Sequence, residues 1–94
     1  MMKYSAGEKK YTVGIIGGMG PEATIDFMSR VIALTPSQRD QDHIHMVVEN
    51  NPHIPDRQAT AENDLIAIEL TAIAGRLEVA GADFLVLPCN TAHI

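Results

Sequence analysis

The sequence predicts an α/β domain with a parallel sheet, in the order strand, helix, strand, helix, strand. Three short apolar runs rich in β-branched residues alternate with two longer segments in which apolar residues recur at helical spacing. Such alternation is typical of parallel strands joined by right-handed helical crossovers. The 94 residues, with 46% hydrophobic residues and a net charge of -5, allow one globular domain at most.

The first strand is predicted over Tyr11–Ile16, after a polar tail over residues 1–10. The glycine-rich turn GGMG ends this strand, and Pro21 suits the first turn of a following helix. Thr35 and Pro36 should end that helix. Apolar residues recur at helical spacing along this predicted helix, at Phe27, Met28, Val31 and Leu34.

A polar loop over Ser37–Asp42 leads to the second predicted strand, residues 43–49. Apolar and polar residues mostly alternate in this strand, although Val47 indicates that the second face is also partly buried. The stretch ENNPHIPDR then predicts an irregular, extended loop, because it carries two prolines and two asparagines.

The second helix is predicted to begin near Ala61 and to end at Gly81, which suits a C-terminal cap. The run Phe84–Leu87 follows as the third strand, and PCNT leads out of it. The apolar stripe of the second helix is predicted to be Ile66, Leu70, Ile73, Leu77 and Ala80.

The composition excludes several classes of protein. The sequence contains neither an apolar window long enough for a membrane span nor a secretory signal, so we expect a cytoplasmic protein without a membrane partner. The acidic balance and the lack of a Lys/Arg cluster argue against nucleic acid as a partner. Cys89 is the only cysteine, which precludes an internal disulfide and leaves a free thiol.

Three unusual stretches follow the three predicted strands: GGMGPEAT, NNPHIPDR and PCNTAH. The carboxyl ends of parallel strands lie along one edge of a sheet, where ligands bind in α/β proteins. The topology should therefore bring Met19, Arg57 and Cys89 towards one cleft.

The glycine turn can be interpreted as an anion-binding site or as a purely structural turn. Gly18, Gly20 and Ala23 satisfy the relaxed dinucleotide pattern G-x-G-x-x-G/A, and Glu49 could serve as the acidic residue that binds a ribose. Pro21, however, removes one amide donor that a pyrophosphate would use, so a small carboxylate fits at least as well. Alternatively, the glycines only permit a tight turn.

The clearest candidates for chemistry are Arg57 and Cys89. The planar donors of Arg57 could grip a carboxylate, although a solvated surface arginine is equally consistent with the sequence. Cys89 follows a strand, and Asn90 or Thr91 could cap a helix there, which would lower the thiol pKa. Those two side chains also offer donors for an oxyanion. A nucleophilic or acid/base thiol is therefore predicted.

The histidines carry less information. His43 and His45 would share a face of the second strand, yet nothing nearby completes a metal site, so surface positions are favoured and no metal is predicted. His93 would lie one helical turn after Cys89, where it could assist the thiol or only solvate the helix.

Five stretches in the same order resemble the N-terminal part of the aspartate/glutamate racemase family, near its aspartate racemase branch. They are VGIIGGMGPEAT, TPSQRDQDH, ENNPHIPDR, GADF and PCNTAH. The resemblance implies a racemase that needs neither pyridoxal phosphate nor any other cofactor, in which two cysteines face each other across the α-carbon of a small acidic amino acid. Cys89 matches the first cysteine. The implied substrate-binding residues are Met19, Gly20, Arg57, Asn90, Thr91 and Ala92.

The family fold has two similar α/β halves with the active site between them, and this chain resembles only the first half. We therefore expect residues 11–94 to form a partial N-terminal α/β domain that is truncated and inactive alone. The full-length parent is expected to be a homodimer. The alternatives are a related isomerase or racemase acting on another carboxylate, a nucleotide-binding α/β module, and a chain that acts only through another subunit.

Overall fold

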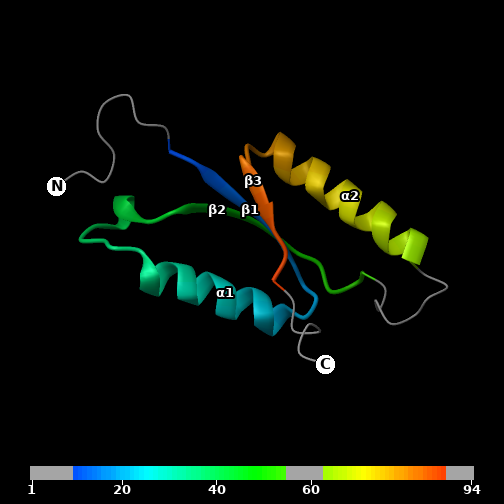
Figure 1. Ribbon diagram of the computed structural model, residues 1–94, viewed down its shortest axis with the longest axis horizontal. Coiled ribbons are helices and arrows are strands. Elements are labelled where there is room, and N and C mark those ends of the chain that lie inside the picture. The colour runs from blue at the N-terminus through cyan, green and yellow to red at the C-terminus, as the bar shows by residue number, and fades with distance from the viewer. Residues whose placement is uncertain (1–9, 55–62, 89–94) are drawn as a thin grey trace.

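Three parallel strands form one sheet, flanked by two helices (Figure 1). The structure is a computed structural model that describes residues 10–54 and 63–88. The predicted order of strands and helices is confirmed. The elements are β1 (Thr12–Gly17), α1 (Pro21–Leu34), the short 3-10 helix η1 (Asp40–Asp42), β2 (His45–Asn50), α2 (Asn63–Val79) and β3 (Phe84–Val86).

The sheet has the order β2-β1-β3, so the first strand of the chain is the central one. Ile15 of β1 is in register with Val48 of β2 and with Val86 of β3. Both neighbours run parallel to β1, as predicted. The continuous burial of β1 from Val13 to Gly17 follows from this central position.

The helices cover opposite faces of the sheet. A Cβ atom at Gly17 would lie 2.6 Å from Oγ1 of Thr24, so this position faces α1, whereas one at Gly14 would lie 3.3 Å from Cβ of Leu77 in α2. Positions an odd number of residues apart point to opposite faces of a strand. Figure 1 shows α1 and α2 on either side of the strands accordingly.

The main core lies between α2 and the sheet. The predicted stripe of α2 is buried at Ile66, Ile73 and Leu77, and Ile73 has no exposed surface. Ile16 of β1 and Ile54 complete the cluster. The stripe ends one turn earlier than predicted, because Ala80 lies in the turn after the helix and is exposed.

Gly81 caps α2 as predicted. The amide of Gly81 donates to the carbonyl of Glu78 at 3.0 Å, and that of Ala82 donates to the carbonyl of Leu77 at 3.0 Å. This pair of bonds is the Schellman motif, which requires a left-handed residue at the position of Gly81, where φ is +106°.

The other face of the sheet is covered less completely. In α1 only Ala23 and Thr24 are buried, and these small side chains let the first turns of the helix approach β1. Of the apolar residues that recur along α1, Phe27, Met28 and Val31 are half-buried, whereas Leu34, the last helical residue, is 81% exposed. No helix within the described ranges has the length and apolar character needed to cross a membrane.

The loop predicted over Ser37–Asp42 contains η1. The buried carboxylate of Asp42 organises it by accepting the amides of Gln38 at 2.9 Å and Arg39 at 3.3 Å. These bonds, the Gln38 amide first, lower the pKa of Asp42. β2 then begins at His45, so the prediction that His43 shares a strand face with it is wrong.

Candidate functional site

The carboxyl ends of the strands meet at one edge, as the topology predicted. Gly17 and Asn50, the last residues of β1 and β2, are partners in the register, and β3 runs in the same direction. Of the predicted site residues, Met19 and Gly20 lie within the described ranges. The others, Arg57, Cys89, Asn90, Thr91 and Ala92, lie outside the described residues, as does His93.

The loops after β1 and β2 are in direct backbone contact. The amide of Asn51 donates to the carbonyl of Gly17 at 2.9 Å. Gly18 has a φ of +109°, and a Cβ atom there would lie 2.6 Å from the backbone nitrogen of Asn51 and closer still to its carbonyl. Only glycine allows this approach, so the two loops hold each other in place.

Thr24 reaches back from α1 to the same turn. Its Oγ1 accepts a hydrogen bond from the amide of Gly18 at 3.0 Å, and the residue is only 2% exposed. The Gly18 amide is therefore already bonded within the protein and is not available to a phosphate. Sequence reasoning missed this role, because the spacing of Gly18 and Thr24 does not reveal where the hydroxyl points.

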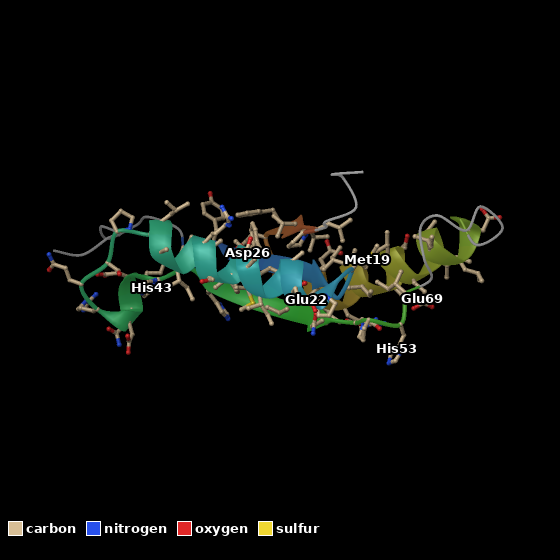
Figure 2. The ribbon with its side chains drawn as sticks, turned by 90° about the horizontal axis from the view of Figure 1, so that it is seen from below. Met19, Glu22, Asp26, His43, His53 and Glu69 are labelled. Carbon is tan, nitrogen blue, oxygen red and sulfur yellow. The ribbon has the colours of Figure 1, made fainter. Side chains whose placement is uncertain are left out.

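Met19 and Gly20 occupy the start of α1. Met19 is half-buried and packs against the core cluster under α2, while Gly20 is the N-cap residue and has no side chain to cap the helix. Glu22 lies in the first turn, where its charge complements the helix dipole. Figure 2 shows Met19 and His53 in the half of the molecule that also holds Glu69 of α2, Glu22 near the middle, and His43 towards the opposite end.

The loop after β2 is shaped by Asn51. Its side-chain oxygen accepts the amide of His53 at 2.9 Å, which is an Asx turn. Ile54, only 9% exposed, anchors the loop in the core. The chain leaves this anchored turn three residues before Arg57.

Glu49 and Arg76 form an ion pair between β2 and α2. The guanidinium donates through Nε to Oε1 at 2.8 Å and through Nη2 to Oε2 at 2.6 Å. These hydrogen bonds lower the pKa of Glu49 and raise that of Arg76. Both carboxylate oxygens therefore already accept a hydrogen bond from Arg76, which makes Glu49 less available to a ribose. The sequence contains no signal that Glu49 and Arg76, 27 residues apart, form an ion pair.

Of the three described histidines, His43 and His45 lie away from this edge, whereas His53 lies in the loop after β2. His45 begins β2, at the amino edge of the sheet, and its Nδ1 is 3.1 Å from the hydroxyl of Thr12. Among residues 10–54 and 63–88, no group of three or more His, Cys, Asp or Glu side chains is placed to hold a metal ion.

Residues 16–94 match the family model described as Asp/Glu/Hydantoin racemase. The chain belongs to this racemase family. The predicted resemblance is thereby confirmed, and the family match includes every predicted site residue, from Met19 to Ala92.

Two racemases illustrate the relationship. The broad specificity amino-acid racemase RacX of Bacillus subtilis (strain 168) is 35% identical over 86 residues, which cover 87% of this chain and 38% of RacX. The solved aspartate racemase of Picrophilus torridus is 39% identical, with a TM-score of 0.75 over 88% of this chain and 37% of that protein. The chain thus spans little more than a third of either racemase, and it shares the aspartate racemase fold over most of its own length.

Proposed function

We propose that this chain is part of an amino-acid racemase that acts on aspartate or glutamate without pyridoxal phosphate or any other cofactor. The observation that carries the proposal is the match to the Picrophilus torridus aspartate racemase, which combines 39% identity with a TM-score of 0.75. Cys89, the only thiol, comes directly after the short segment that follows β3. It thus follows the carboxyl edge of the sheet, where α/β proteins bind their ligands.

The reaction needs a base and an acid on opposite faces of the α-carbon. The thiolate of Cys89 removes the α-proton from one enantiomer, and a second group returns a proton to the opposite face. Because Cys89 is the only cysteine, a second thiol would come from outside these 94 residues. The α-proton is weakly acidic, so fixed donors must stabilise the enolate-like intermediate.

The remaining site residues would hold the substrate. Arg57 is suited to bind a carboxylate through two parallel hydrogen bonds, as Arg76 binds Glu49 in this molecule. The interlocked turns at Gly18 and Asn51 supply a rigid frame at this edge. Pocket-lining or hydrogen-bonding roles are proposed for Met19, Gly20, Asn90, Thr91 and Ala92.

Residues 11–94 would form the N-terminal α/β part of the racemase, after a tail over residues 1–10, and the complete protein would act as a homodimer. Phe84 and Leu85 of the edge strand β3 are 50% and 41% exposed, as expected of a surface that further protein covers.

Two alternatives differ in their support. A broader range of amino acids is favoured by the 35% identity to RacX, which is named for broad specificity. A nucleotide-binding module is disfavoured, because the Gly18 amide is bonded to Thr24 and the Glu49 carboxylate to Arg76.

The decisive experiment is racemisation of aspartate and glutamate in deuterium oxide by the full-length protein. With two bases on opposite faces, the product enantiomer should acquire deuterium at the α-carbon while the remaining substrate stays unlabelled at early times. Cys89→Ser should lower kcat by about 100-fold or more, because the serine hydroxyl is a far weaker acid than the thiol and is not deprotonated near neutral pH to act as the base. Ser29→Ala, at an exposed position of α1, serves as the matched control and should keep full activity.

Failure of the full-length protein to exchange the α-proton of either amino acid would refute the proposal. Equal early labelling of substrate and product would instead refute the two-base mechanism. Turnover of neutral amino acids at similar rates would shift the assignment to the broader substrate class.

A further inference from the structure

We infer that Thr24 is a positioning residue of the substrate site, whose buried hydroxyl holds the loops after β1 and β2 in their working geometry. This inference rests on the proposed function, because it assumes that the carboxyl edge binds the substrate. Thr24 itself lies beneath the turn and is 2% exposed, so it acts through its neighbours.

The hydroxyl has a specific partner. Oγ1 of Thr24 accepts the amide of Gly18 at 3.0 Å, and Gly18 is buried. A buried amide that loses its acceptor carries a desolvation penalty, so the turn would move to find another partner. The hydroxyl and the methyl group of Thr24 both also lie against Gly17, because a Cβ atom there would be 2.6 Å from Oγ1 and 2.7 Å from the methyl carbon.

A movement of Gly18 would be passed to the neighbouring loop. Gly18 lies against the backbone of Asn51, whose amide is bonded to Gly17 and whose side chain holds the amide of His53. Thr24 therefore supports a continuous chain of contacts from α1 through the turn at Gly18 to residues 51–53 of the loop after β2. Met19 follows Gly18 directly, and the second loop leads to Arg57. Substrate binding is sensitive to such shifts, because productive geometry tolerates only a fraction of an ångström.

Two variants separate the hydroxyl from the shape of the side chain. Thr24→Val keeps the branched shape and removes the acceptor, whereas Thr24→Ser keeps the acceptor and removes the methyl group. If Thr24 only filled space, Thr24→Ser would be the more damaging change. If it positions the loops, Thr24→Val should be the more damaging change for the reaction.

The kinetic test uses the full-length protein with aspartate and glutamate, at a temperature where circular dichroism shows every variant fully folded. We expect Thr24→Val to lower kcat/KM about tenfold, mostly through a higher KM, because the loops it displaces bind the substrate. Thr24→Ser should stay within about twofold of the parent protein. An unchanged kcat/KM in Thr24→Val, or an equal loss in both variants, would overturn the inference.

A second measurement does not depend on activity. Amide hydrogen exchange should be about tenfold faster at Gly18 in Thr24→Val than in the parent, and faster at Asn51, with Ile15 in the centre of β1 unchanged. Unchanged exchange at Gly18 and Asn51 would overturn the positioning role. If the parent protein proved inactive, the proposed function would fail, while the exchange comparison would still decide whether Thr24 holds the two loops.

Discussion

At the residue scale, two glycines show that one backbone conformation can meet different demands. Gly18 and Gly81 have nearly the same φ, +109° and +106°. Gly81 ends α2 in open space, with no described residue other than its chain neighbours within 4 Å of an added Cβ, whereas Gly18 is pressed against the backbone of Asn51. Gly18 is therefore required both by its backbone conformation and by its contact with Asn51, whereas Gly81 is required by its conformation alone.

This difference predicts unequal costs for the same substitution. Gly81→Ala should lower the free energy of unfolding by about 1 kcal/mol, the usual cost of a left-handed alanine. Gly18→Ala should lower it by about 3 kcal/mol or more, since the backbone of Asn51 must also move. Urea unfolding monitored by circular dichroism measures both values. Similar losses for the two variants would contradict the close contact at Gly18.

At the scale of elements, β2 is tied to α2 by an ion pair as well as by apolar packing. The pair joins Glu49 near the end of the strand to Arg76 in the last turn of the helix, with two short hydrogen bonds. A second pair, Asp26 with Arg30, lies within α1 at 2.8 Å and is largely exposed on both sides. Of these two ion pairs, only Glu49–Arg76 links two elements. Neutralising it should therefore change the stability of the fold more than neutralising Asp26–Arg30.

We predict that Glu49→Gln destabilises the fold at pH 7 and that Asp26→Asn changes stability little. Because the folded pKa of Glu49 lies below its ordinary value of 4.5, its stabilisation is fully present above about pH 4.5. The stabilisation should disappear as the pH falls through the folded pKa. The difference in unfolding free energy between parent and Glu49→Gln should therefore shrink on acidification. A difference that stays constant from pH 7 to pH 3 would argue against the pair.

At the scale of the whole molecule, the described surface exposes several large apolar side chains. They occur on both helices and on β3, and the most relevant to association are those on the edge strand, which has a partner only on its β1 side among the described residues. Uncovered apolar surface beside an open sheet edge favours association. The large exposed apolar residues of α1 and β3 are Ile25, Ile32, Leu34, Phe84 and Leu85.

We predict that the 94-residue chain, purified alone, self-associates as its concentration rises, as measured by sedimentation velocity. Phe84→Lys should raise the protein concentration at which half of the chain is self-associated about tenfold, equivalent to about 1.4 kcal/mol, because it places a charge on the edge strand. Val79→Lys, at a 90% exposed position ending α2, should have little effect. A chain that remains monomeric at all concentrations, or an equal effect of both variants, would contradict a role for the β3 edge.

Sequence periodicity predicted the elements best where one face alone is buried. The stripe of α2 was correct from Ile66 to Leu77, because helical spacing directly reports a single buried face. Helical spacing does not tell whether Leu34 is buried, since an apolar residue at the end of a helix is buried only if another element reaches it. His43 was assigned to a strand because alternation does not mark where pairing begins.

The sequence alone determined the order of elements, the parallel sheet and the common edge at which the carboxyl ends of the strands lie, because hydrophobic periodicity and crossover handedness are local or general properties. It also carried the resemblance that the family match confirmed. Only the tertiary structure showed that the Thr24 hydroxyl accepts the Gly18 amide, that Gly18 packs on the backbone of Asn51 and that Arg76 forms an ion pair with Glu49. These contacts join residues from separate elements, and their existence depends on side-chain direction and backbone approach, which one-dimensional spacing does not encode.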